Sequence, residues 1–373
     1  MKRKKITVRA FLSILSDDPH DRAELSLQPI KSIEADRVTE CKIGSKTVFK
    51  LKDAKLLEQY QDRVNQRFLS NIEVSNSAIA YVKNKSYLDL FEPHIYGYHF
   101  LRVDIKSYFH SISRELIKTS FSTYINDEDF IKGQQKLIDA FTNILTLNVG
   151  DKPKNNALAG KEILPIGFKT SPAVSNIIFR RFDNLIQSLC SKNHITYTRY
   201  ADDMLFSSPL KFKFIHTRKF MDELSYILSL GGFLINDKKT VKEKHMISLN
   251  GYVIESNGVT GQPAKIRISN RKTNIIAKLI NKLDHNVDCK LIMSKLFNLS
   301  EKSIKVKYKK GRDDFIDQYY RTQLINVISG YRAYLISIIK FNCKYNCIDK
   351  NHLSKYQLMI NKLEKHLLRL SNW

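Results

Sequence analysis

Tyr200-Ala201-Asp202-Asp203 stands between two apolar runs, Ile195-Thr196-Tyr197-Thr198-Arg199 before it and Met204-Leu205-Phe206-Ser207-Ser208 after it. Two β-prone runs around a short polar pair predict a β-hairpin with the acids at its turn. Adjacent carboxylates repel each other unless they share a cation, and Mg²⁺ prefers oxygen ligands of this kind. Asp is also common in plain polar turns, so the pair gains meaning only from the rest of the chain.

A third carboxylate, Asp104, closes an apolar strand that is predicted over His99-Phe100-Leu101-Arg102-Val103-Asp104-Ile105. A helix cap after a strand is the plainer explanation for this Asp. If the strand and the hairpin are neighbours in one sheet, however, all three carboxylates face one point. Two metal ions about 3.5–4 Å apart catalyse in-line phosphoryl displacement at such sites. We therefore expect Asp104, Asp202 and Asp203 to be catalytic and to ligate metal.

The segment Leu164-Pro165-Ile166-Gly167 leads through Thr170-Ser171-Pro172 into an apolar helical pattern. Gly167 allows the backbone to approach a ligand closely, Ser171 suits a helix cap and Pro172 suits the first helical position. A helix start behind such a loop favours phosphate. Loops of this kind are common, so the segment matters only beside the three acids.

The chain has 373 residues and a formal net charge of +25, from 62 Lys and Arg against 37 Asp and Glu. This excess favours a polyanion partner, and nucleic acid fits better than an anionic membrane because we find no basic amphipathic helix with a concentrated apolar face. The five cysteines are widely spaced and show no zinc pattern. No apolar run is long enough to span a bilayer, and we predict a cytoplasmic protein without a membrane partner.

Hydrophobic spacing predicts the main elements. The pattern predicts a strand over Lys46–Lys52 and a helix over Leu56–Phe68, then a helix up to His94 and mostly helical structure over 114–147. A further helix is predicted over Phe214–Leu230. The polar stretch Ser256–Gln262 suits a domain boundary. Beyond it the chain is basic and helical, with clustered cations at Lys265, Arg267, Arg271 and Lys272 and again at Lys302, Lys305, Lys307, Lys309, Lys310 and Arg312.

Several motifs, in a fixed order, resemble those of the reverse transcriptase family. Any one of them is weak, but their order and spacing make coincidence a poor explanation. The motifs are Lys46-Thr47-Val48-Phe49, Tyr81 with Lys85, Ser86 and His94, Val103-Asp104-Ile105-Lys106-Ser107-Tyr108-Phe109, Leu164-Pro165-Ile166-Gly167 with Thr170-Ser171-Pro172 and Asn176, Tyr200-Ala201-Asp202-Asp203, Asn236 with Lys239 and Thr240, and Leu249-Asn250-Gly251-Tyr252.

The resemblance covers about residues 45 to 260. Within the family, the chain is similar to the bacterial retron, abortive-infection and defence-associated enzymes. Two positions depart from the usual pattern. Ile166 stands where most relatives have Gln, which puts the usual template contact in doubt, and Lys46 stands where the family usually has Arg.

The resemblance implies roles for individual residues. The Ile105 carbonyl would help Asp104, Asp202 and Asp203 to hold metal. Phe109 would exclude a ribose 2′-hydroxyl, although plain core packing is the alternative. Gly167 would let its loop approach the nucleotide, and Lys46 and Lys85 would contact the triphosphate or the template. Lys239 would bind at the nucleotide and assist pyrophosphate departure as a cation or acid, although it is equally well explained as a surface lysine.

We therefore expect an α+β right-hand polymerase, with an N-terminal segment and fingers over 1–95, a palm over 96–261 that includes a fingers insertion around 114–165, and a basic helical thumb over 262–373. The expected activity is RNA-directed DNA synthesis with dNTPs and two Mg²⁺ ions, or Mn²⁺. The template would be a non-coding RNA, the product DNA and the role anti-phage defence, with a partner defence protein or a homo-oligomer as further options. Template-independent or protein-primed synthesis, a non-catalytic nucleic-acid-binding protein and a palm-fold nucleotide cyclase are the alternatives.

Overall fold

The computed structural model describes the chain except for residues 1–4, 45, 257, 260–261, 305–311 and 372–373. Its contacts divide it into two compact units. The large unit comprises Met1–Leu90 and Leu101–Lys242, and the C-terminal unit comprises Phe91–Phe100 and Glu243–Trp373. The predicted fingers, palm and thumb have their boundaries elsewhere, after residues 95 and 261, and that division stays a prediction. Four lysines of the second basic cluster, Lys305, Lys307, Lys309 and Lys310, lie outside the described residues.

A four-stranded sheet with the order β11-β4-β10-β9 carries the predicted acids. Its strands are β4 (His99–Asp104), β9 (Thr196–Tyr200), β10 (Asp203–Ser208) and β11 (Val241–Lys244). Strands β9 and β10 pair antiparallel with Asp203 opposite Tyr200, so Ala201 and Asp202 form the turn of the predicted hairpin. Five successive side chains of β10 are buried, as a continuous apolar run predicts.

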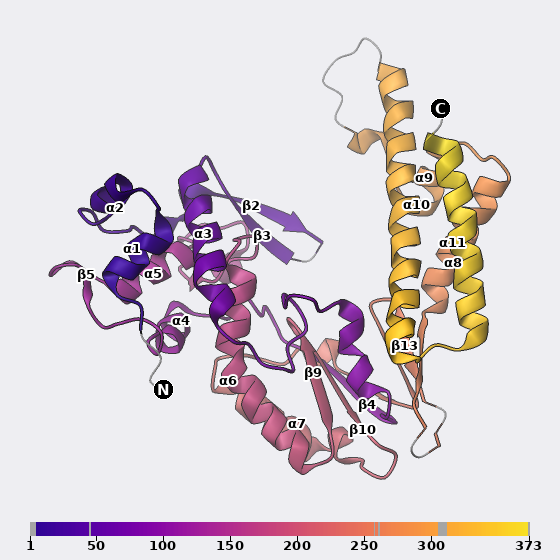
Figure 1. The fold of residues 1–373 in the computed structure, drawn as a ribbon, viewed down its shortest axis with the longest axis horizontal. Coiled ribbons are helices and arrows are strands. Elements are labelled where there is room, and N and C mark those ends of the chain that lie inside the picture. Colours follow the sequence, from indigo (N-terminus) through magenta and orange to yellow (C-terminus); the bar gives the residue numbers. More distant parts are fainter. Residues whose placement is uncertain (1–4, 45, 257, 260–261, 305–311, 372–373) are drawn as a thin grey trace. The chain divides into compact units, whose positions relative to one another are not determined.

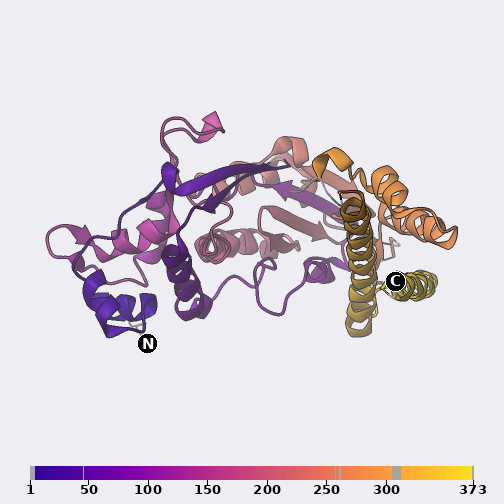
Figure 2. The same ribbon diagram turned by 90° about the horizontal axis from the view of Figure 1, so that it is seen from above.

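Helices and smaller sheets complete the large unit (Figures 1 and 2). The helices are α1 (Val8–Leu15), α2 (Pro19–Leu25), α3 (Lys55–Arg67), α4 (Arg114–Phe121), α5 (Leu137–Leu145), α6 (Ser171–Lys192) and α7 (Arg218–Ser229). The strands β2 (Val38–Ile43) and β3 (Lys46–Leu51) form a hairpin, as do β5 (Asp129–Ile131) and β6 (Gln135–Lys136), and β1 (Ile33–Glu34), β7 (Leu147–Asn148) and β8 (Glu162–Ile163) form a third sheet.

Helix α6 packs against β9, and Figure 1 shows it beside the β9–β10 hairpin. It buries Val174, Ile178 and Phe182 at helical spacing against the core. Pro172 lies in its first turn, as predicted. The prediction that Ser171 caps the helix is wrong, because its hydroxyl donates to the Pro165 carbonyl at 2.6 Å instead.

In its described residues, the C-terminal unit combines an antiparallel sheet with four α-helices. The strands β12 (Met246–Leu249), β13 (Tyr252–Glu255) and β14 (Lys265–Ile268) are followed by α8 (Asn270–Asp284), α9 (Cys289–Phe297), α10 (Arg312–Tyr345) and α11 (Lys350–Ser371). Helices α10 and α11 lie side by side in both views (Figures 1 and 2). The region beyond residue 262 thus contains the helices that its hydrophobic spacing predicts.

Residues 313–345 of α10 are long and apolar enough, by length and composition, to cross a membrane. The prediction that no run reaches this length is wrong for this helix. The evidence for a span is weak, because a core helix of a globular unit passes the same test. Helix α10 also buries a stripe of side chains that includes Tyr320, Leu324 and Ile328. Such a stripe is how an amphipathic helix packs on its neighbours.

Candidate active site

Two of the three predicted acids and several predicted nucleotide contacts meet at one pocket of the large unit, whereas the third acid, Asp203, is not among the lining residues. Asp104, Ile105, Phe109 and Asp202 line it, and the pocket has a volume of about 430 Å³. The other lining residues include Lys46, Ile166, Asn236, Lys239 and His110. The structure thus brings together residues that lie up to 193 positions apart, from Lys46 to Lys239 (239 − 46), as the motif order predicts.

Asp104 lies at the end of β4, where its side chain is almost completely buried. Its Oδ1 accepts a hydrogen bond from Asn236 Nδ2 at 2.9 Å, and its Oδ2 pairs with Lys239 Nζ at 2.9 Å. The Asn236 backbone N–H also donates to the Asp104 carbonyl. The carboxylate is therefore fixed by a charged and a neutral donor, and the Lys239 side chain that supplies the charge is itself 55% exposed.

The tip of the β9–β10 hairpin holds the other two acids. Ala201 has a left-handed φ of +54°, which turns the chain between the strands. The Ile105 N–H donates to the Asp202 carbonyl at 3.0 Å and ties the tip to the end of β4. The carboxylate of Asp202 lies 3.7 Å from Lys46 Nζ, and both side chains are partly exposed. This contact is a loose surface ion pair.

Asp203 pairs with Arg102, a residue that the sequence analysis left without a role. Arg102 Nε and Nη2 donate to Asp203 Oδ1 at 3.0 and 2.6 Å. Burial raises the pKa of Asp203, Arg102 opposes this, and the charges of Asp202 and Asp104 raise it further. The three carboxylates therefore lie within electrostatic reach of one another. Each also has its own basic partner, namely Lys239, Lys46 or Arg102.

A buried ion pair under the hairpin was also missed. Arg199 and Asp183 are both inaccessible to solvent, and Arg199 Nη2 and Nε donate to the Asp183 carboxylate at 2.8 and 3.0 Å. Arg199 Nη1 donates to the Ala201 carbonyl at 3.2 Å and to the Tyr108 hydroxyl at 3.1 Å. Tyr197 also donates its hydroxyl proton to Asp183. Burial alone lowers the pKa of Arg199, but Asp183 outweighs this and the pKa rises. This network fixes the turn that carries Asp202.

Phe109 is buried below the pocket, with its ring 6.3 Å from that of Tyr81 and 5.2 Å from that of Tyr108. It both lines the pocket and packs in the core, so the two explanations of Phe109 are compatible. His110 lines the pocket as well, although we predicted no role for it, and burial lowers its pKa to about 4. A neutral imidazole therefore faces the site at neutral pH.

Two predicted nucleotide contacts, Gly167 and Lys85, are not among the described residues that line the acid-lined pocket. Gly167 has a φ of +113°, and a Cβ there would lie 2.2 Å from the Phe49 carbonyl oxygen. Phe49 N–H donates to the Ile166 carbonyl at 2.8 Å, so the close approach that Gly167 permits is to β3. Lys85 donates from Nζ to the backbone carbonyls of Asn76 and Ala78, both at 3.2 Å.

The donor set suits a hard divalent cation. Within the described part of the chain, no three His, Cys, Asp or Glu side chains are grouped as a metal site. The acids at the pocket nevertheless offer only oxygen, which fits Mg²⁺ or Mn²⁺ better than a softer metal. Their oxygens face basic side chains, which shows that positive charge is favoured at this place.

The family profile described as "Reverse transcriptase (RNA-dependent DNA polymerase)" matches residues 39–254, more than half of the chain. The chain belongs to the reverse transcriptase family. The matched residues include the whole pocket and the β9–β10 hairpin, and the predicted α+β class is confirmed. The predicted resemblance to bacterial retron enzymes is confirmed as well, by the relatives that the chain matches.

Among these relatives is the retron Ec83 reverse transcriptase of Escherichia coli, which is 35% identical over 136 residues, or 36% of this chain and 40% of the relative. The retron Ec86 reverse transcriptase of the same organism is 28% identical over 184 residues, or 49% of this chain and 50% of the relative. The chain thus spans half or less of the length of these two relatives. A telomerase from Candida albicans, solved with a telomeric RNA fragment, covers 93% of this chain and 61% of its own at 12% identity, with a TM-score of 0.40.

Proposed function

We propose that this chain is an RNA-directed DNA polymerase. One observation carries the proposal: Asp104 and Asp202 line the same pocket as Lys46, Lys239 and Phe109. Acids for metal, cations for phosphate and an apolar side chain for a sugar are the groups that nucleotidyl transfer needs. The family membership and the retron relatives support the same activity.

We infer that Asp104, Asp202 and Asp203 hold two Mg²⁺ ions, or Mn²⁺, with help from the Ile105 carbonyl. Such ions lower the pKa of a primer 3′-hydroxyl and stabilise the leaving pyrophosphate. Lys239 and Lys46 now pair with Asp104 and Asp202, and with metal held by these acids both lysines would be available to contact the triphosphate. Arg102 keeps Asp203 oriented, because its two hydrogen bonds reach a single oxygen and leave the other open.

Phe109 would lie beside the sugar and exclude a ribose 2′-hydroxyl, so dNTPs are the proposed substrates. Gly167 would act on the nucleotide indirectly, by seating the Ile166 loop against β3. Lys85 binds backbone carbonyls, so its proposed contact to nucleotide or template requires it to leave them. From the family membership, we also propose a division into fingers over 1–95, palm over 96–261 and thumb over 262–373.

We further propose a non-coding RNA template, a DNA product and a cytoplasmic role in anti-phage defence, alone as a homo-oligomer or with a partner defence protein. The net charge of +25 supports a nucleic-acid partner. The defence role is an analogy with related enzymes and needs a test of its own.

Template-independent or protein-primed synthesis is the second candidate, because the apolar Ile166 lines the pocket at the position where the family resemblance implies Gln. An apolar side chain there cannot donate a hydrogen bond to a template or nucleotide. The deciding experiment measures dNTP incorporation with and without added RNA and sequences the product together with co-purifying RNA. Products complementary to an RNA support the first proposal. Products of equal yield and unrelated sequence without RNA support the second, and no product with either contradicts both.

A further inference from the structure

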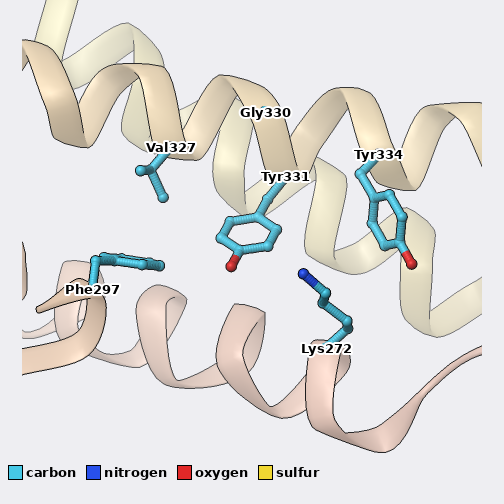
Figure 3. A pocket seen from close by; sticks show the side chains of 6 residues that line it. All are labelled: Lys272, Phe297, Val327, Gly330, Tyr331 and Tyr334. Atoms are coloured by element: carbon cyan, nitrogen blue, oxygen red, sulfur yellow. The ribbon is translucent and has the colours of Figure 1, made fainter. Parts of the chain in front are cut away.

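A second pocket lies within the C-terminal unit and shares no lining residue with the acid-lined site (Figure 3). Helices α8, α9 and α10 contribute its walls, and its volume is about 290 Å³. Six residues line it: Lys272, Phe297, Val327, Gly330, Tyr331 and Tyr334. Four of them come from one face of α10, at positions three or four apart, so the pocket is a feature of that helix face.

One end of the pocket is apolar and aromatic. The rings of Phe297 and Tyr331 lie 6.2 Å apart with an angle of 36° between their planes. In Figure 3, Val327 points from α10 toward Phe297. At Gly330 an added Cβ would meet no heavy atom within 4 Å, so the helix leaves space there. Walls of this kind receive a flat ring by offset or edge contacts.

The other end of the pocket is cationic. Lys272 extends from α8 toward α10, and its ammonium group lies beside Tyr331 (Figure 3). The Lys272 side chain is half-buried, yet among the described residues no hydrogen bond or ion pair to its Nζ is found. A half-buried ammonium without a partner favours an anion. Burial raises the pKa of Tyr331, so its hydroxyl stays protonated and can donate a further hydrogen bond.

We propose that this pocket binds one nucleotide, with its base against Phe297 and Tyr331 and its phosphate on Lys272. The volume is that of a small ligand site and holds one nucleotide rather than a longer stretch. Base stacking on aromatic side chains next to a cation is also how single strands are held without sequence preference. The nucleotide is either a free mononucleotide or one residue of a single strand. The proposal is independent of the polymerase function.

The pocket also touches the turn between β12 and β13. Tyr334 donates its hydroxyl proton to the Gly251 carbonyl at 3.0 Å. A Cβ on Gly251, which has a φ of +94°, would lie 3.0 Å from Lys272 Cγ. A nucleotide whose phosphate moves Lys272 therefore changes the packing of this turn. Because the turn joins β12 and β13, binding at the pocket would affect the sheet of the same unit.

Isothermal titration of the full chain with AMP in EDTA tests the proposal, because chelation removes metal-dependent binding at the acid-lined pocket. We expect one AMP per chain, at least tenfold weaker binding of adenosine and of inorganic phosphate, and at least tenfold loss of AMP affinity in Lys272→Met. Gly330→Leu should abolish binding by filling the pocket, and leucine favours a helix more than glycine does. Lys278→Met, an exposed lysine of the same helix, and Asp202→Ala with Asp203→Ala should bind AMP normally.

A parallel titration with a pentanucleotide distinguishes the two sources. If the chain binds the pentanucleotide but not AMP, and Gly330→Leu weakens this binding, the pocket is a site for single-stranded nucleic acid. The proposal is wrong if neither ligand binds, if phosphate alone binds as well as AMP, or if Lys272→Met and Gly330→Leu both bind like the unchanged chain.

Discussion

Arg199→Met should lower the free energy of unfolding by about 3–5 kcal/mol, the usual cost of leaving a buried charge without its partner. Asp183 is inaccessible to solvent, and among the described residues it would keep only the Tyr197 hydroxyl as a side-chain donor. For a unit of this size the change corresponds to a loss of roughly 6–20 °C in melting temperature. Thermal and urea unfolding of the purified chain measure both quantities.

Two further variants separate stability from catalysis. Arg199→Met with Asp183→Leu removes both charges, and a buried pair replaced by apolar groups is often neutral, so most of the lost stability should return. Its rate of dNTP incorporation should stay low with an unchanged KM, because the Ala201 carbonyl still lacks its donor. Arg180 lies on α6, as Asp183 does, and forms a partly exposed ion pair with Glu73; Arg180→Met, which breaks this pair, should cost at most about 1 kcal/mol.

The reasoning about Arg199 is refuted if Arg199→Met destabilises the chain no more than Arg180→Met does. It is refuted equally if the double variant is as unstable as the single one. Full recovery of both stability and turnover in the double variant would leave the ion pair with a purely structural role.

Three other changes have defined outcomes. Gly167→Ala should destabilise the chain by at least about 1–3 kcal/mol in urea unfolding, because its φ of +113° and the Phe49 carbonyl 2.2 Å away both oppose a Cβ; unchanged stability would contradict this packing. Phe109→Ala should raise the ratio of rNTP to dNTP incorporation in single-nucleotide extension, and an unchanged ratio would remove its proposed role. Burial lowers the pKa of His94 from 6.5 to about 3. Folded His94 thus binds fewer protons than the unfolded chain between these values, so its stabilising contribution is complete above pH 6.5 and is lost as the pH falls. Between pH 6.5 and pH 5, the free energy of unfolding should fall by about 2 kcal/mol more in the unchanged chain than in His94→Leu. An equal fall in both proteins would contradict the linkage.

The elements that could be predicted are those with a regular hydrophobic period or a run of β-prone residues. Strand β3, strand β4, helix α3 and the β9–β10 hairpin lie within one or two residues of their predicted ranges. The order of the motifs was enough to place Asp104 and Asp202 at one pocket. Hydrophobic spacing and motif order can both be read directly from the sequence, so the elements that depend on them could be predicted.

The predicted helix up to His94 is wrong. That stretch forms two short 3₁₀ turns, Tyr87–Leu90 and Glu92–His94. The Asp89 carboxylate accepts hydrogen bonds from the Ser86 N–H and hydroxyl, and Pro93 provides no N–H, so local side-chain bonds replace a helical ladder. The predicted helical region over 114–147 is likewise interrupted by the β5–β6 hairpin, where Gly133 has a φ of +67°.

The partners of the acids could not be predicted, because ion pairs join positions that no short pattern connects. Arg102 and Asp203 lie 101 positions apart in the chain. One signal was present, since Arg102 is two residues before Asp104 on a strand and therefore shares its face. Arg199 gave another signal, as a lone charge inside an apolar run predicts a buried partner. Its partner, Asp183, is only found once α6 is placed against β9.

RNA-templated primer extension in Mg²⁺ with Asp202→Asn is the most direct test of the proposed active site. The substitution keeps the shape of the side chain and removes the charge that we assign to metal binding. We expect the rate to fall by roughly a hundredfold or more, because metal-held charge contributes several kcal/mol to such a reaction. Asp222→Asn, at an exposed Asp of α7, should extend the primer at the normal rate. Equal extension by Asp202→Asn and the unchanged chain would contradict the proposed active site.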